Sequence, residues 1–460
     1  MKKSELLTGG ALLAVLAFLL PLCALGQAAG GWQNLFDGKT LAGWKRLGGT
    51  ADFKVENGAI VGTTALHSGN TFLVTEREYG DFQLELDVLI EGAENNSGVQ
   101  LRSHFGTEGH AGKVYGRQVE IDPTARSWSG GVYDEDRRQW LYPLDLHPQA
   151  KSAFKAGQYN HLKIENIGSE LKTWVNGVPV AYVVDALDPR GFIGLQVHDV
   201  GAPEQAGKKV RFKNIRLNTT NLTPSPFAAD VYVASFVPNY LTPYEQQHGW
   251  QLLFDGKTTA GWRSAKAATF PAQGWRVANG MLTVLSSEGK EAANGGDIVT
   301  TDQYGAFDLS FEFKLTPGAN SGVKYFVTLN EQTDGSAIGL EYQVLDDERH
   351  PDAKLGRDGN RTLASLYDLI TAQKPPRFVH PIGEWNVGRV VVLPNNHVTH
   401  YLNGVKVLEY VRGSAEYKKL VAESKYRVWP NFGEAPQGHL LLQDHGNEVS
   451  FRSLKIKQLK

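Results

Sequence analysis

The chain has 460 residues, with 47 Lys and Arg against 49 Asp and Glu, and a formal net charge of −2. It is too long for one ordinary domain, and a hydrophobic fraction of 41% is enough for packed cores, which excludes a globally disordered chain. The near-zero charge argues against a nucleic-acid-binding protein, which usually carries a basic face. The 50 glycines and 10 tryptophans are typical of a turn-rich β protein.

The first 26 residues have the pattern of a secretory signal peptide. Two lysines precede an apolar stretch (11–25), and small residues follow it. A retained membrane anchor is the alternative, but the stretch is short for a bilayer span and contains Pro21. We therefore expect an exported protein, periplasmic or extracellular, with no membrane span in the mature chain. Because the single cysteine, Cys23, lies in this segment, the mature chain should have no disulfide, thiolate metal site or cysteine nucleophile.

An internal repeat dominates the rest of the sequence. Six strings recur in the same order: GWQNLFDGKTLAGW (31–44) as GWQLLFDGKTTAGW (249–262), YGDF (79–82) as YGAF (304–307), NSGV at 96–99 and 320–323, VNGV (175–178) as LNGV (402–405), LQVH (195–198) as LQDH (442–445), and FKNI (212–215) as FRSL (451–454). A repeat this long indicates two whole domains, not a solenoid of short units. We predict domains at 31–218 and 249–460. The linker between them, 219–248, contains prolines but also apolar residues, so we expect it to pack against one or both domains.

The local patterns predict β structure in both copies. Apolar and polar residues alternate over 82–88 and 307–315, which places one face of each strand on a core. Asn-Gly pairs at 176–177 and 403–404 lie between apolar runs, as in tight hairpins. Helical periodicity is weak, with short helices expected only near 143–155 and 414–424. These patterns favour two-sheet antiparallel sandwiches of the jelly-roll type.

The repeated strings resemble the family named for 3-keto-disaccharide hydrolase activity. The resemblance covers nearly all of residues 31–217 and 249–457. It implies an all-β protein with two concanavalin A-like jelly-roll β-sandwich domains in tandem, which agrees with the strand patterns. It also implies extracytoplasmic sugar chemistry on an oligosaccharide or glycoside substrate.

A glycoside oxidised at carbon 3 can be cleaved without a conventional glycosidase mechanism. The ketone acidifies the hydrogen on carbon 2, a base removes it, the aglycone leaves carbon 1 by elimination, and water adds to complete hydrolysis. This requires a base, a group that stabilises the enolate oxygen, and an acid for the leaving group. The catalytic candidates are Arg102, Glu120, His198, Lys324, Glu341 and His445, with His400 as a further histidine to consider.

Other residues suit sugar or metal binding. A carboxylate and a carboxamide two residues apart on a strand share one face, and flat rings cover the apolar face of a sugar. The substrate-binding candidates are Gln118, Tyr133, Trp140, Gln343, Tyr367 and Trp429. No zinc-binding spacing occurs, but a divalent ion such as calcium, held by oxygen ligands, remains open, with Asp122 and Asp346 as candidate ligands. Both aspartates could equally begin turns.

Three alternatives stay open at this stage. A non-catalytic, bivalent carbohydrate-binding protein would explain the duplication. A conventional two-carboxylate glycosidase could pair Glu120 with Asp122, or Glu341 with Asp346. In a mixed protein one copy is catalytic and the other binds. The second copy keeps two strings of the family pattern, GEWN (383–386) and LQDHG (442–446), which favours it, whereas Arg102 favours the first copy.

Overall fold

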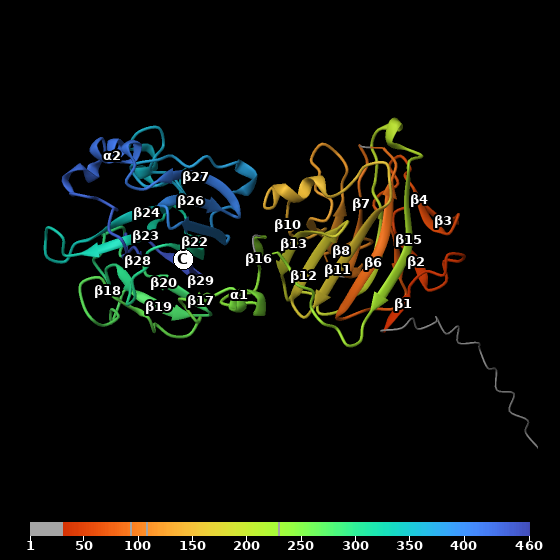
Figure 1. Ribbon diagram of the computed structural model, residues 1–460, viewed down its shortest axis with the longest axis horizontal. Helices are drawn as coiled ribbons and strands as arrows, with labels where there is room; N and C mark the ends of the chain where they lie inside the picture. The colour runs from red at the N-terminus through yellow and green to blue at the C-terminus, as the bar shows by residue number, and fades with distance from the viewer. Residues whose placement is uncertain (1–30, 93, 107–108, 229–230) are drawn as a thin grey trace, which may run out of the picture.

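The computed structural model describes residues 31–92, 94–106, 109–228 and 231–460, so the signal peptide predicted over 1–26 lies outside the described residues. Strands make up 43% of the chain and helices 8%, which confirms the predicted all-β fold. Two β-sandwiches lie side by side, with β16 and α1 between them (Figure 1). Within the described residues, no helix has the length and apolar character needed to cross a membrane.

The first sandwich contains a nine-stranded and a seven-stranded sheet. The nine-stranded sheet has the order β16 (Val233–Ser235), β13 (Val178–Val184), β12 (Glu170–Val175), β11 (Asn160–Ile167), β6 (Phe82–Ile90), β15 (Lys209–Asn218), β4 (Ala59–Thr63), β3 (Asp52–Glu56), with β1 (Trp32–Asn34) also paired to β15. The seven-stranded sheet has the order β10 (Gln139–Tyr142), β9 (Val132–Glu135), β8 (Val114–Ile121), β7 (Ser97–Phe105), β14 (Phe192–Val197), β5 (Thr71–Thr75), β2 (Trp44–Gly48).

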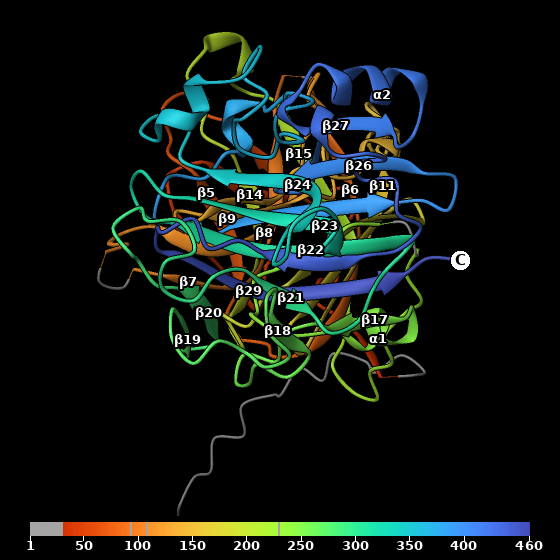
Figure 2. The ribbon, with the colours of Figure 1, turned by 90° about the vertical axis from the view of Figure 1, so that its left-hand side faces the viewer.

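The second sandwich repeats this arrangement with an eight-stranded and a five-stranded sheet. The larger has the order β19 (Trp275–Ala278), β20 (Met281–Val284), β29 (Val449–Gln458), β22 (Phe307–Leu315), β25 (Asn386–Val392), β26 (His397–Leu402), β27 (Val405–Val411), with β17 (Trp250–Leu252) also paired to β29. The smaller has the order β18 (Trp262–Ser264), β21 (Ile298–Thr300), β28 (His439–Leu442), β23 (Asn320–Leu329), β24 (Ala337–Leu345). Viewed end-on, the strands of both layers cross the view in similar directions, as in an aligned sandwich (Figure 2).

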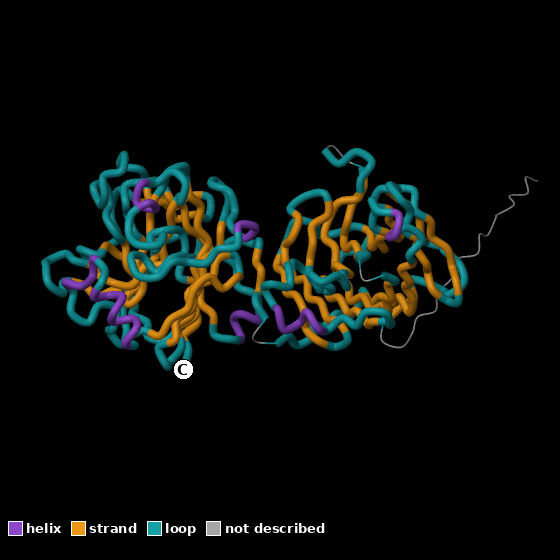
Figure 3. Tube along the Cα trace, turned by 90° about the horizontal axis from the view of Figure 1, so that it is seen from above, coloured by secondary structure: helices purple, strands orange, loops and turns teal. Residues whose placement is uncertain are grey.

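Among the described residues the helices are short and lie outside the sheets (Figure 3). The α-helices are α1 (Pro243–Gln247) and α2 (Ala415–Ala422), and the 3₁₀ turns are η1 (Pro148–Ser152), η2 (Pro203–Gln205), η3 (Pro351–Lys354), η4 (Pro376–Phe378) and η5 (Lys425–Val428). The helix expected near 414–424 is therefore confirmed. The one expected near 143–155 is only a 3₁₀ turn, because prolines at 143 and 148 interrupt it.

The core of each domain lies between its two sheets. In β6 the apolar positions from Phe82 to Ile90 are buried and the alternate positions are half-buried, as the period-two pattern predicts. In β22 the polar positions are buried as well. Arg389 holds Asp308 with bonds of 2.7 and 2.6 Å, and the linker lies over the same face, so the outer side of this strand is not open to water.

The linker packs against both domains, as expected. β16 pairs in parallel with β13 of the first domain, and Phe227 packs edge-on against Trp174 at 5.0 Å. Glu245 in α1 forms a buried ion pair with Lys455 of the second domain. These contacts hold the two domains together through the linker.

The direct contact between the domains can be tested at two equivalent hairpin glycines, Gly177 and Gly404. Gly177 and Gly404 both have φ +81, where a side chain costs about 1 kcal/mol. A Cβ on Gly404 would lie 2.4 Å from Leu146 of the first domain, whereas a Cβ on Gly177 would meet nothing within 4 Å. We expect Gly404→Ala to lower the urea unfolding midpoint more than Gly177→Ala, by a further loss of about 1 kcal/mol from overpacking. Equal losses in the two variants would contradict this contact.

Candidate active site

Each domain carries a pocket over three equivalent strands: β7, β8 and β14 in the first, and β23, β24 and β28 in the second. The NSGV glycine lies beneath each pocket. A Cβ on Gly98 would lie 2.2 Å from Gln118 Cδ, and one on Gly322 would lie 2.3 Å from Glu341 Oε1. The motif needs glycine here because a polar side chain of the neighbouring strand lies directly across the backbone.

The first pocket has a volume of about 190 Å³, and its lining is entirely polar or aromatic. The lining residues are Asn70, Asn96, Gln118, Glu120, Arg126, Tyr133, Glu135, Trp140, Gln196 and His198. The structure thus brings together five of the seven first-domain candidates: Gln118, Glu120, Tyr133, Trp140 and His198.

Glu120 is already well partnered in this pocket. Gln118 Nε2 donates to Glu120 Oε2 at 3.0 Å, Asn96 Nδ2 donates to Oε1 at 3.4 Å, and an Arg126 nitrogen lies 3.6 Å from Oε1. Burial raises the pKa of Glu120 to about 8, against the lowering effect of the Gln118 hydrogen bond. Burial therefore favours the protonated, neutral form of this carboxyl group.

Aromatic rings form one wall of the first pocket. Trp140 contacts Tyr133 and Trp128 edge-on, with ring centroids 5.1 and 4.5 Å apart. The Arg126 guanidinium lies over Trp140 at 4.9 Å. The polar part of the lining includes Gln196, which is 1% exposed. Its side-chain amide oxygen and nitrogen have no hydrogen-bond partner among the described residues.

The second pocket is larger, about 590 Å³, and mixes charged, apolar and aromatic groups. Its lining residues are Glu291, Lys324, Ala337, Ile338, Gly339, Glu341, Gln343, His350, Pro351, Asp352, Leu355, Tyr367, Lys425, Tyr426, Trp429, Gln443 and His445. Six sequence-predicted residues meet here: Lys324, Glu341, Gln343, Tyr367, Trp429 and His445.

Glu341 is the central carboxylate of the second pocket. Its side chain is 5% exposed, and Lys324 Nζ lies 3.9 Å from Oε2. Burial raises the pKa of Glu341, while the positive charges of Lys324, Lys425 and His445 pull it down. His445 lines the same pocket, with its ring 6.4 Å from that of His350. A buried carboxylate, an ammonium group and an imidazole therefore share one cavity.

The strand register shows that the two pockets place their carboxylates differently. Gly98 pairs with Glu120, and the equivalent Gly322 pairs with Gln343. The residues two positions earlier on the same strands, Gln118 and Glu341, are therefore equivalent to each other. Gln118 pairs with Gln100, and Glu341 with Lys324. The first pocket has an amide pair where the second has a carboxylate and a lysine.

Arg102 does not line the first pocket, contrary to the sequence-based prediction. It is 1% exposed, and its guanidinium donates to the carbonyl oxygens of Gly80, Gly168 and Asn166 at 2.7–2.8 Å and to Asp81 at 2.8 Å. Burial lowers the pKa of Arg102 to about 10. The residue joins loops of the first domain and has no donor left for a substrate.

The two candidate metal ligands, Asp122 and Asp346, both stabilise turns. Asp122 accepts from Arg126 at 2.6 Å and from the Thr124 amide at 3.1 Å. Asp346 accepts from the Gly318 amide at 2.8 Å and from the Glu348 amide at 3.1 Å. Neither lines a pocket, and the described part of the chain contains no group of three or more His, Cys, Asp or Glu side chains arranged to hold a metal ion.

His400 lies in the core of the second domain instead of the pocket. It is fully buried and bonded to Tyr325 Oη at 2.7 Å and the Ala364 carbonyl at 3.0 Å. Burial lowers the pKa of His400 to about 4 from 6.5. The unfolded chain therefore binds a proton between these values that the folded chain does not, so stability falls as the pH drops from 6.5 to 4.

We expect the low pKa of His400 to reduce the free energy of unfolding by about 3 kcal/mol as the pH falls from 6.5 to 4. Urea unfolding at pH 7 and pH 4.5 should show a smaller acid loss for His400→Gln than for the parent chain. The exposed-side neighbour His397, changed to Gln, is the matched control. An unchanged acid loss in His400→Gln would contradict the prediction.

A family model described as the 3-keto-alpha-glucoside-1,2-lyase-like domain matches residues 31–218 and again residues 249–457. The chain belongs to this family. The resemblance seen in the sequence is thereby confirmed, and both pockets lie in matched regions.

One relative agrees with this membership. A 3-keto-disaccharide hydrolase of Bacteroides thetaiotaomicron is 36% identical over 232 residues, which cover 46% of this chain and 79% of the relative. Two crystal structures of candidate glycosyl hydrolases from Parabacteroides distasonis match at 29% and 25% identity with TM-scores of 0.43 and 0.35. They cover 49% and 46% of this chain and 100% and 99% of their own chains. This membership supports a hydrolase-type enzyme acting on a glycoside.

The sequence analysis did not identify several residues that line the pockets of these 3-keto-alpha-glucoside-1,2-lyase-like domains. Gln196 and Gln443 carried a signal, since both belong to the repeated LQ string. Asn96 likewise begins the repeated NSGV string. His350 and Lys425 belong to none of the repeated strings, so no pattern pointed to them.

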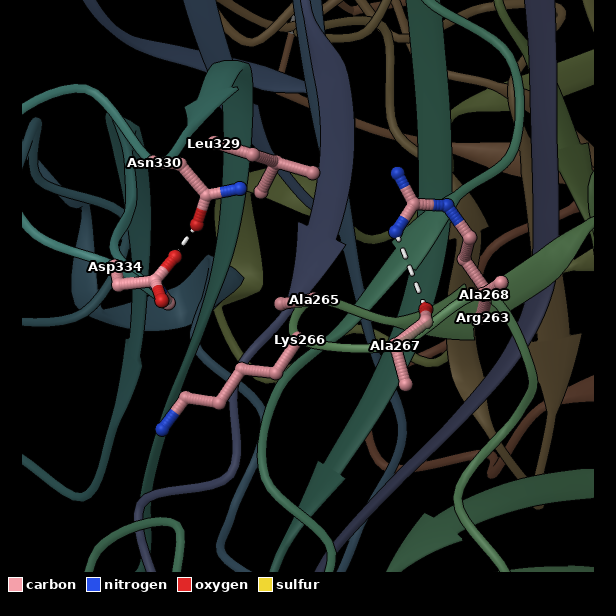
Figure 4. Close-up of a pocket in the computed structure, with 9 residues that line it drawn as sticks. Arg263, Ala265, Lys266, Ala267, Ala268, Leu329, Asn330 and Asp334 are labelled. Atoms are coloured by element: carbon pink, nitrogen blue, oxygen red, sulfur yellow. Dashed lines mark hydrogen bonds between the residues drawn. The ribbon is translucent and has the colours of Figure 1, made fainter.

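A further open pocket lies near the edge of the smaller sheet of the second domain (Figure 4). Alanines 265, 267 and 268 line it together with Lys266 and Asp334. Arg263 is bonded there to the Ala267 carbonyl at 3.3 Å. The lining contains no histidine and no buried carboxylate, so this pocket does not suit acid–base chemistry.

Proposed function

We propose that this protein hydrolyses 3-keto-glycosides, 3-keto-disaccharides among them, in the pocket of the second domain. The observation that carries the proposal is the buried Glu341 carboxylate with Lys324 3.9 Å away and His445 lining the same cavity. This set matches the base, the enolate-stabilising group and the acid that the elimination requires.

Each group has one role in the proposed reaction. Glu341 removes the proton from carbon 2, and its raised pKa makes it a stronger base than an exposed carboxylate. Lys324 stabilises the negative charge that develops on the carbon 3 oxygen. His445 gives a proton to the departing aglycone oxygen as the bond to carbon 1 breaks. Water then adds to the unsaturated sugar: His445 takes a proton from the water as its hydroxide bonds to carbon 1, and Glu341 returns a proton to carbon 2. This leaves a free 3-keto sugar and the free aglycone, with both side chains restored.

The remaining lining residues suit substrate binding. Gln343 and Gln443 each have a buried side-chain oxygen without a hydrogen-bond partner among the described residues, and a sugar hydroxyl could donate to it. Tyr367 and Trp429 offer flat rings, with Lys425 Nζ held 4.2 Å from the centre of the Tyr367 ring. Ile338 and Leu355 give the pocket an apolar side where an aglycone can lie.

A second candidate, the conventional glycosidase, is favoured by one observation in the first pocket. Glu120 and Glu135 both line it, and burial raises the pKa of each. Hydrolysis of an unoxidised glycoside requires two carboxyl groups, one protonated as the general acid and one ionised as the base or nucleophile.

A paired assay tests these candidates. The purified chain is given a 3-keto-disaccharide or its unoxidised parent in D₂O, each with and without a chelator. Cleavage of the keto sugar alone, with deuterium at carbon 2 of the product, is the expected result. Cleavage of the parent would favour the glycosidase, and sugar binding without cleavage would favour a non-catalytic protein. The chelator arms decide whether a divalent ion such as calcium takes part, and secretion of the full chain decides export.

A further inference from the structure

We propose that the first-domain pocket binds an unoxidised, neutral sugar unit through its free hydroxyl groups and does not cleave it. This assignment rests on the proposed function in one respect: cleavage takes place in the second domain. The ligand is one pyranose ring of a glycan or of the unmodified parent disaccharide.

The first pocket lacks the carbon-acid chemistry of the second. Where the second domain has Glu341, the first has Gln118, whose amide cannot remove a proton from carbon. Where the second has Lys324, the first has Gln100, whose Nε2 donates to Gln118 Oε1 at 2.8 Å. The two amides thus bond to each other, which leaves neither a base nor a cation at these positions.

Glu120 and Arg126 of the first pocket are also engaged. Both Glu120 oxygens accept hydrogen bonds from amide side chains, at 3.0 and 3.4 Å. Arg126 Nε donates to Asp122 at 2.6 Å, and its guanidinium carbon lies 4.7 and 4.9 Å from the ring centres of Trp128 and Trp140. This arrangement fixes the pocket wall and does not present a free cation for an enolate oxygen.

The groups that remain available suit hydroxyl groups. Gln196 is buried with an unpaired amide oxygen and an unpaired amide nitrogen, so it can accept from one hydroxyl and donate to another. Trp140 and Tyr133 provide aromatic ring faces of the kind that cover the apolar face of a pyranose. At about 190 Å³, against about 590 Å³ in the second domain, the cavity suits one ring without an aglycone.

The second domain supports this binding wall. Arg377 forms an ion pair with Asp145 of the first domain and lies over Trp128 at 5.4 Å. Trp128 in turn packs edge-on against Trp140 at 4.5 Å. The sugar platform is therefore held in a fixed position relative to the catalytic domain, and a glycan bound there stays attached to the enzyme while the second pocket is empty.

Calorimetry on the full chain carrying Glu341→Gln tests the proposal, with the unoxidised disaccharide as the probe. We expect binding at one site, weakened at least tenfold by adding Trp140→Ala or Gln196→Met. The second substitution keeps the volume of the side chain and removes the amide, so it is informative even if Trp140→Ala does not fold. Trp385→Ala is the matched control, since Trp385 lies under Arg452 at 4.0 Å, outside both pockets.

Three results would overturn the proposal: no binding by the folded chain, binding that neither substitution weakens, or cleavage that is lost in Glu120→Gln and retained in Glu341→Gln. Because binding is read without turnover, its failure is distinct from that of the proposed function. A chain that binds the disaccharide through Trp140 but cleaves no keto sugar would overturn only the catalytic assignment.

Discussion

Replacing Glu341 by Gln is expected to lower kcat/KM for a 3-keto-disaccharide by about 10³-fold, the range typical of a general base. Gln keeps the size and hydrogen-bonding shape of the side chain, so the loss reports the missing base. The acid limb of the pH–rate profile should disappear with it, since that limb records the protonation of Glu341. Steady-state kinetics over the pH range, together with deuterium exchange at carbon 2, provide the measurement.

A surface carboxylate provides the control for this substitution. Glu409 is bonded to Lys406 at 2.9 Å on β27, half-exposed and outside both pockets. Glu409→Gln should retain the parent kinetics. If Glu341→Gln retained more than a tenth of the parent activity, the base would have to be another group, and the first pocket would be the next place to look.

The repeat and the alternating strands were enough to predict two jelly rolls, because each domain buries one face of every strand. The polar candidates on β8 and β24 were also predictable, since residues two apart on a strand share a face. The position of Arg102 was not predictable, because the bulge within β7 and the folding of three loops onto its guanidinium are tertiary features.

The sequence difference between the two copies on β8 and β24 can be interpreted only once the strand pairing is known. In the sequence, Gln-Val-Glu against Glu-Tyr-Gln reads as a neutral exchange of two polar residues. In the sheet, the exchange moves the carboxyl group from the position opposite glycine to the position opposite Lys324. That single shift separates a carboxyl group held by amides from one beside a lysine, a distinction that depends on contacts across strands.

Replacing Lys324 by Met is expected to lower kcat by about 10²-fold to 10³-fold, as for loss of one oxyanion-stabilising donor. A second effect concerns pH. The Lys324 ammonium lowers the pKa of the buried Glu341, so its removal lets burial raise that pKa further. Because the base works only when deprotonated, the rising limb of the pH–rate profile should move to higher pH.

The combination of a rate loss and a pH shift separates this role from a structural one. Lys314→Met is the matched control, since Lys314 lies over Trp385 at 5.2 Å on β22 and touches neither pocket. It should change neither kcat nor the pH dependence. A Lys324→Met variant that lost activity with no pH shift would show that Lys324 does not act on Glu341, and its role would then be limited to contact with the substrate.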